Sequence, residues 1–239
     1  MKTTTKITAF LVLLISTTSC MFDGFGIQGN RNVVTEDRKI SAEFEGIKTS
    51  EGITVYLTQD SEVDLTVEAD ENIIDLLVTE VKDDILVIHF EKNVSRAKAR
   101  NVYVKAPKIN SLKATSGAHI KSENTIDAKN LRISSTSGAS MNIEIEAENV
   151  NCSSSSGADI NVKGAATNFD GSASSGSHIN ARNLETEISD VGASSGAGIR
   201  VNVSEELTAS ASSGGSISYD GSPKVLNKSK SSGGSISGH

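Results

Sequence analysis

The sequence predicts an all-β protein whose C-terminal half is a parallel β-solenoid with coils of about nineteen residues. Three observations predict this class. A Ser-Gly pair, followed by a small residue, any residue and an aliphatic residue, recurs seven times. Apolar or small residues alternate with polar ones between these pairs, which is the periodicity of strands. Aromatic residues make up 4% and Trp is absent, which suits thin, regular β layers better than a bulky core.

A lattice of apolar residues at nineteen-residue intervals sets the expected coils. Two short strands, a tight turn and a return loop fill one interval, and each strand then pairs with its equivalent in the next coil. One bulged residue near Asp190 should absorb the one coil in which the glycine comes a position late. The last coil carries Lys228 and Lys230 at inward positions, as expected of a polar end that prevents end-to-end stacking. The lattice consists of Leu112, Leu131, Val150, Phe169, Ile188, Leu207 and Leu226.

A glycine holds the same place in every turn, which indicates a backbone with positive φ that a β-branched residue would strain. The serine before it should form a ladder along the stack through its hydroxyl group. These structural turn glycines are Gly117, Gly138, Gly157, Gly176, Gly196, Gly214 and Gly233.

Residues 33–109 are also strand-like but lack the nineteen-residue lattice. We therefore expect irregular β coils or a β cap there, continuous with seven regular coils over residues 110–239. No linker separates the two parts, so residues 33–239 form a single solenoid domain.

The first twenty residues have the pattern of an export signal. Lys2 and Lys6 precede an apolar run over residues 7–15, which is too short to span a bilayer, and small residues then lead to Cys20. This resembles a bacterial lipoprotein signal, which implies a signal peptide over residues 1–19 and a diacylglycerol on Cys20; the alternative is an ordinary signal peptide with an incidental Cys. Residues 20–32, glycine-rich and without hydrophobic period, are expected to be a lipid-anchored tether.

The residues that could carry chemistry are few. A net charge of −7 argues against a nucleic-acid partner. Stacking should place Ser140, Asp159 and His178 on adjacent coils, but a catalytic triad needs the histidine in the middle, so no catalytic residue is predicted. His119 and His178 would lie three coils, or about 14 Å, apart, so no metal site and no cofactor is expected.

One outward row does suggest binding. Asn142, Asn161 and Asn180 follow one another at the same offset in successive coils, and their amides could recognise sugars or peptides. The same row could equally be an asparagine ladder that stabilises the stack. Cys152 falls on the inward alternation and is expected to be a small buried residue.

The chain also resembles a Gram-negative envelope family, the putative auto-transporter adhesins with a head GIN domain, over roughly residues 40–220. The resemblance rests on Phe44-Glu45-Gly46-Ile47, on the run from Gly52 to Gln59, on Val67-Glu68-Ala69-Asp70-Glu71-Asn72 and on the Ser-Gly-Ala turns. It implies a right-handed parallel β-helix similar to pectin-lyase-like folds, a suggested adhesive role and no established catalytic residues.

Together these observations predict a cell-envelope lipoprotein, anchored in the outer membrane, that acts as a non-catalytic binding or adhesion module. Its partners would be the membrane, through the lipid, and a glycan or protein ligand. The sequence leaves open whether it faces the periplasm or the cell surface, and which oligomer it forms. The alternative is a periplasmic structural or sensing protein, and a carbohydrate-active enzyme of the pectin-lyase-like type is the least favoured.

Overall fold

The computed structural model describes residues 26–40 and 42–239. The expected signal peptide and Cys20 lie outside these residues. Within them the secondary structure consists of strands and one short 3₁₀ turn, η2 (Ile74–Leu76). None of the described residues belongs to a helix that is long and apolar enough to cross a membrane.

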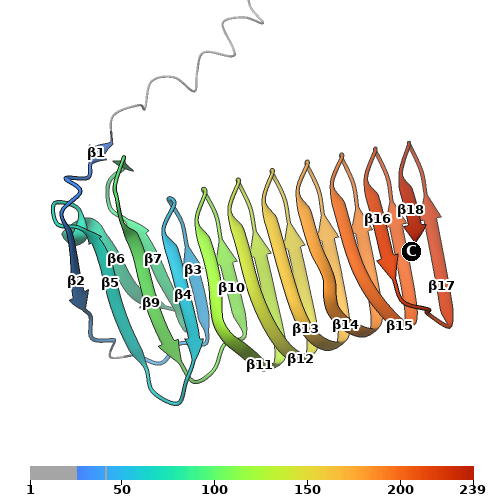
Figure 1. Ribbon diagram of the computed structural model, residues 1–239, viewed down its shortest axis with the longest axis horizontal. Coiled ribbons are helices and arrows are strands. Elements are labelled where there is room, and N and C mark those ends of the chain that lie inside the picture. The colour runs from blue at the N-terminus through green and yellow to red at the C-terminus, as the bar shows by residue number, and fades with distance from the viewer. Residues whose placement is uncertain (1–25, 41) are drawn as a thin grey trace, which may run out of the picture.

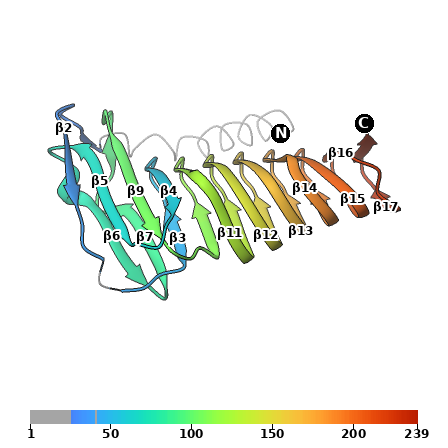
Figure 2. The same ribbon diagram turned by 60° about the horizontal axis from the view of Figure 1, so that its bottom comes forward.

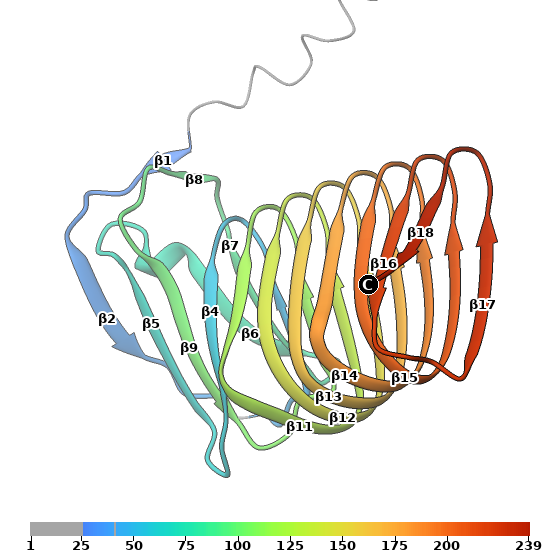
Figure 3. The same ribbon diagram turned by 45° about the vertical axis from the view of Figure 1, so that its right-hand side comes forward.

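The C-terminal half is a parallel β-solenoid, as predicted (Figure 1). Each long strand runs down one wall, round a bend and up the other wall, so the two walls belong to one continuous 16-stranded sheet (Figure 3). These long strands are β11 (His119–Ser135), β12 (Ser140–Ser154), β13 (Asp159–Ala173), β14 (His178–Ala193) and β15 (Gly198–Ala211). Shorter strands complete the stack, namely β10 (Ser111–Ala114), β16 (Ser216–Asp220), β17 (Val225–Lys230) and β18 (Ser235–Gly238).

We call the two walls the post-turn sheet and the pre-turn sheet. The post-turn sheet holds the strand halves that directly follow each Ser-Gly turn and ends in β16 and β18. The pre-turn sheet holds the halves that lead up to the turns and ends in β17. Inward side chains of both sheets fill the narrow core between them. Ile120, Met141, Ile160 and Ile179, in four successive coils, are at most 1% exposed, and burying each contributes about 1.5–3 kcal/mol.

The turn that joins the sheets has positive φ at both central residues. In the turn at Gly157, φ is 55° at Ser156 and 68° at Gly157, and the Ala158 N–H donates to the Ser155 carbonyl over 3.2 Å. This is the pattern of a type I′ turn, which favours glycine at its second central position. The predicted positive φ of the glycines is therefore confirmed, but the sequence did not indicate that the preceding serine also adopts it.

The ladder along the turns is made by the main chain. The Gly157 N–H donates to the Ser175 carbonyl of the next coil over 3.1 Å, and equivalent bonds join the other turns. The expected ladder of serine hydroxyls is thus replaced by backbone hydrogen bonds. An ideal Cβ at Gly157 would meet no atom within 4 Å, so the backbone conformation alone requires glycine there.

Two members of the apolar lattice do not hold their expected register. Ser111 pairs with Arg132, so Leu112 aligns with Ile133 and the first coil is two residues longer than predicted. Ile188 pairs with Asn168, points outward and is 43% exposed, while Ser189 takes the inward place.

The coil that contains Ile188 has one extra residue, which lies in β14 just after its post-turn half. The register shifts between the pair Asn161 and Asn180 and the pair Lys163 and Asn183, and not near Asp190 as expected. The pre-turn half of β14 stays in register up to the turn, so the bulge lies close to the bend instead.

The N-terminal part is a cap continuous with the solenoid, as predicted (Figure 2). From β2, at the outer edge of the cap, the chain passes into one coil made of β3 and β4. It then runs out to the end of the stack through β5 and β6 and returns through β7, β8 and β9. Strands β7 and β9 pair in parallel with β3 and β4, whereas β5 and β6 pair antiparallel. The strands are β2 (Val33–Asp37), β3 (Gly46–Thr49), β4 (Thr54–Gln59), β5 (Asp64–Asp70), β6 (Leu77–Lys82), β7 (Ile85–Phe90), β8 (Val94–Ser95) and β9 (Arg100–Ala106).

This path explains why the nineteen-residue lattice is missing before residue 110. The order of strands in the stack differs from their order in the chain, so equivalent positions are not evenly spaced. One regular feature survives, because the turn between β3 and β4 has positive φ at Glu51 and Gly52. The Gly52 N–H donates to the Ser116 carbonyl over 3.1 Å, which extends the backbone ladder by one turn.

Residues 26–32 do not form the flexible tether expected from the sequence. Strand β1 (Ile27–Gln28) pairs with β8. Gly29 lies so close to Asp70 that an ideal Cβ there would be 2.1 Å from the Asp70 Oδ2 atom. The buried Asp70 carboxylate accepts the Arg31 N–H over 2.8 Å and thereby holds this segment against the cap.

Candidate functional site

The outward side of the post-turn sheet presents columns of polar side chains that run along the solenoid axis. We call this surface the polar face. Strand pairing places equivalent residues of successive coils directly beside one another, about 4.8 Å apart. The column nearest the turns is Thr54, His119, Ser140, Asp159, His178, Gly198, Ser216 and Ser235. The next column is Tyr103, Tyr56, Lys121, Asn142, Asn161, Asn180, Arg200, Ser218 and Ser237.

The predicted asparagine row lies in this second column. Asn142, Asn161 and Asn180 are in register, and the Asn180 amide donates to the Asn161 Oδ1 atom over 3.1 Å. Asn142 makes no side-chain hydrogen bond to either neighbour within the described residues. The row is therefore only half connected as a ladder, and its remaining amide groups face solvent.

A complete asparagine ladder, which the sequence analysis missed, lies on the pre-turn sheet. Asn149 donates to Asn130 and Asn168 donates to Asn149, each over 2.9 Å. The signal was present in the sequence, because these three residues have nineteen-residue spacing and directly precede the apolar lattice.

Ser140, Asp159 and His178 stack in the predicted order, and His119 extends the column by one coil. The column forms two pairs: His119 Nδ1 lies 2.6 Å from Ser140 Oγ, and His178 Nδ1 lies 3.5 Å from Asp159 Oδ1. Asp159 thus contacts the histidine that is far from the serine, so it cannot orient His119 as the carboxylate of a triad does.

Histidine, cysteine and carboxylate side chains do not converge in the described part of the chain. No group of three or more of them there could hold one metal ion. His119 and His178 are separated along their column by Ser140 and Asp159. Cys152 is 1% exposed and points into the core, where burial, with a smaller effect of Asp170, raises the pKa of its thiol.

Two aromatic rings at the N-terminal end of the polar face were not singled out from the sequence. Tyr56 and Tyr103 stack with ring centroids 5.0 Å apart, and Lys121 Nζ lies 5.7 Å from the centroid of Tyr56. The Tyr103 hydroxyl donates to Glu68 over 3.0 Å. Burial and this carboxylate raise the pKa of Tyr103.

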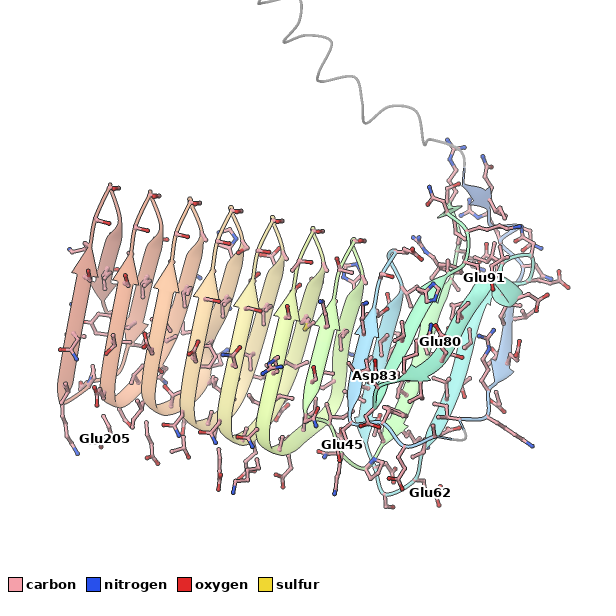
Figure 4. All side chains as sticks on the ribbon, turned by 180° about the vertical axis from the view of Figure 1, so that it is seen from behind. Glu45, Glu62, Glu80, Asp83, Glu91 and Glu205 are labelled. Atoms are coloured by element: carbon pink, nitrogen blue, oxygen red, sulfur yellow. The ribbon has the colours of Figure 1, made fainter. Side chains whose placement is uncertain are left out.

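Charged side chains concentrate near the bends and pair across neighbouring coils. Lys163 Nζ lies 2.8 Å from Glu144 Oε2 and lowers the pKa of Glu144. Lys224 Nζ lies 2.7 Å from Glu205 Oε2, and Figure 4 shows Glu205 at the bend edge of the last coils. These exposed pairs contribute little to stability, because solvent screens them. They make an alternating, solvated charge pattern along the bends.

Comparison with solved structures finds the same fold in putative adhesins and in a putative lipid binding protein. A putative adhesin from Bacteroides fragilis NCTC 9343 is 26% identical, with a TM-score of 0.83, over 90% of this chain and 100% of that one. A putative lipid binding protein from Parabacteroides distasonis ATCC 8503 is 21% identical, with a TM-score of 0.70, over 89% of this chain and 99% of that one. A putative adhesin from Parabacteroides merdae ATCC 43184 is 17% identical, with a TM-score of 0.70, over 89% and 98%.

The last two similarities are to the fold alone. None of the curated proteins matches the chain. The family model described as putative auto-transporter adhesin, head GIN domain matches residues 43–223, which include β3 to β16 and the polar face from Thr54 to Ser218. This match covers most of the solenoid and its cap, and the chain belongs to that family.

Proposed function

We propose that this protein is a cell-envelope lipoprotein, anchored through Cys20, whose solenoid is a non-catalytic binding or adhesion module. The observation that carries the proposal is the polar face, a regular outward surface that extends over every coil from β11 to β18. Its amide and hydroxyl groups can exchange hydrogen bonds with the hydroxyl groups of a glycan or the backbone of a protein. Membership of an adhesin-like family supports a role outside the cytoplasm and outside catalysis.

The geometry of the hydrogen-bonded serine and histidine pair on the polar face supports binding over catalysis. Ser140 has His119 beside it, but no carboxylate among the described residues pairs with His119, and Asp159 pairs with His178 instead. We therefore expect no hydrolysis or cleavage of polysaccharides by the mature protein. Incubation with uronate-containing and neutral polysaccharides, followed by chromatography of the products, tests this; release of oligosaccharides that Ser140→Ala abolishes would contradict it.

The anchor and the location are tested together in cells. Protease treatment of intact cells should degrade the solenoid if it faces outward, and Cys20→Ala should release the protein from the membrane fraction. Protection until lysis would favour the alternative, a periplasmic structural or sensing protein. Membrane retention of Cys20→Ala, with no lipid incorporated into the unsubstituted chain, would refute the anchor.

The role of the polar face is tested with substitutions that leave the stack intact. Asn142→Ala combined with Asn161→Ala should weaken binding of the purified chain to cells or immobilised glycans, because their outward amides are removed. The matched control is Asn151→Ala, an exposed asparagine of β12 on the pre-turn sheet. Equal binding by both variants, with unchanged melting temperatures, would refute the polar face as the binding surface.

A further inference from the structure

The polar face is hollowed near its C-terminal end. Gly198 stands in the column nearest the turns, between His178 and Ser216, and contributes no side chain there. An ideal Cβ at Gly198 would lie 3.0 Å from His178 Cδ2, so the neighbouring ring closes one side of the hollow. The result is a groove of about 710 Å³ lined also by Asn161, Asn180 and Arg200.

One unpaired cationic side chain, that of Arg200, lines the groove of a protein whose net charge is negative. None of the described residues that line it is acidic. Arg182, at its rim, is already neutralised by Asp220, with Nε to Oδ2 at 2.7 Å and Nη2 to Oδ1 at 3.1 Å. Arg200 is exposed and makes no ion pair with any described carboxylate. Its guanidinium is thus available to an anion from solution.

Neutral hydrogen-bonding groups stand directly beside this guanidinium. Asn180 is the strand-pairing neighbour of Arg200, and its amide is oriented by the 3.1 Å bond to Asn161. The Asn180 Oδ1 atom also accepts the Arg182 N–H over 3.5 Å. The Asn161 amide nitrogen and one lone pair of each carbonyl oxygen remain for a ligand. On the other side, the groove continues to the hydroxyls of Ser216 and Ser218. The apolar floor residues Ile179 and Ile199 are each 1% exposed, so there is no pocket for a large apolar side chain.

We infer that this groove binds an acidic saccharide, with Arg200 holding the anionic group and Asn161 and Asn180 bonding the neighbouring ring hydroxyls. The inference rests on the proposed binding role of the polar face and adds the class of ligand. Arginine binds carboxylate, sulfate and phosphate in a bidentate manner. A uronate, a sulfated sugar and a phosphorylated sugar share this chemistry. A glycan fits better than an acidic peptide, because amides and hydroxyls line the groove where a peptide would also need apolar anchors.

The test uses the purified mature chain and isothermal titration with an oligogalacturonate. Its fully methyl-esterified form is the matched neutral ligand, since esterification removes the charge of each carboxylate and adds only a methyl group. We expect the ester and the variant Arg200→Gln each to lower the affinity by about tenfold or more, and added salt to weaken binding. The affinity of Arg200→Lys should lie between those of the unsubstituted chain and Arg200→Gln, because lysine keeps the charge but lacks the planar, two-pronged guanidinium group. Sulfated and phosphorylated disaccharides titrated in parallel identify which anion binds best.

Two further variants separate the site from general electrostatics. Arg132→Gln removes an exposed arginine of the pre-turn sheet that has no ion pair within the described chain, and it should leave the affinity unchanged. Gly198→Ser keeps every charge but fills the hollow, and it should weaken binding while the melting temperature stays within a few degrees.

Several results would overturn the inference. These are equal affinity of Arg200→Gln and the unsubstituted chain, equal binding of the acid and its ester, tighter binding of polyglutamate than of oligogalacturonate, or no binding of any acidic sugar. Its failure is distinguishable from that of the proposed function. If binding to cells depends on Asn142 and Asn161 but not on Arg200, the polar face binds and the anionic ligand is wrong.

Discussion

The buried carboxylate of Asp70 allows a quantitative test of how the N-terminal segment is held. Asp70 is fully buried and accepts backbone N–H groups from Arg31 over 2.8 Å, Lys98 over 3.0 Å and Ala99 over 3.0 Å. It therefore ties together the segment before β2, the end of β5 and the loop before β9. Burial opposes its ionisation, but the hydrogen bonds from Ala99, Arg31 and Lys98 outweigh burial, and the pKa of Asp70 is lowered.

Replacing Asp70 by Ala leaves these donors without their acceptor. A buried donor without a partner costs about 1–3 kcal/mol. Arg31 and Lys98 are exposed residues whose N–H groups can turn to water, whereas Ala99 is buried. We therefore expect a loss of about 3 kcal/mol in the free energy of unfolding. For a chain of this size that corresponds to a melting temperature lower by about 6–12 °C.

The pH dependence follows from the direction of the pKa shift. Because the folded-state pKa of Asp70 lies below its ordinary value of 3.8, its stabilisation is fully present above about pH 5 and is lost as the pH falls through the folded-state pKa. The difference in stability between the unsubstituted chain and Asp70→Asn should therefore be largest near neutral pH and shrink below about pH 4.

The assay is thermal unfolding followed by circular dichroism between pH 2 and pH 8, with Asp75→Asn as the control because Asp75 is exposed on η2. Limited proteolysis should also cut within residues 26–32 sooner in Asp70→Ala. The reasoning is refuted if Asp70→Ala melts within about 2 °C of the unsubstituted chain. So small a change in melting temperature corresponds to a loss of no more than about 1 kcal/mol in the free energy of unfolding. A difference for Asp70→Asn that stays constant down to pH 2 would refute the electrostatic part.

Three further predictions concern the turns, the core and the open end. Gly157→Val places a β-branched residue at a φ of 68° and should lower the stability by about 1 kcal/mol or more, so an unchanged melting temperature would contradict the turn geometry. The Cys152 thiol, buried and with a raised pKa, should not react with a thiol reagent at pH 8 until the protein is unfolded; rapid labelling of the folded protein would show that the core opens. Lys228→Ala with Lys230→Ala makes the last coil resemble the alanines of the coil before it, and the variant should associate end to end at raised concentration, as a larger mass in light scattering; an unchanged mass would show that these lysines do not protect the end.

The sequence by itself determined the features that repeat locally. The strand alternation, the turn glycines and the coil length of about nineteen residues are visible because each coil meets the same environment and therefore needs the same residue types. The asparagine row on the polar face and the inward place of Cys152 followed from the same periodicity. So did the stacking of Ser140, Asp159 and His178, together with the argument that they are in the wrong order for a triad.

Only the tertiary structure decided the features that depend on pairing between distant segments. A one-residue shift of register hardly changes the sequence pattern. Ile188 therefore matched the apolar lattice, although the side chain that fills the core is that of Ser189. In the cap, the order of strands in the stack differs from their order in the chain. The structural role of Asp70 is visible only in the folded protein, where the backbone N–H groups of Arg31 and Ala99 donate to its carboxylate. The groove at Gly198 likewise requires three coils in register, because a missing side chain becomes a binding surface only where its neighbours stand beside it.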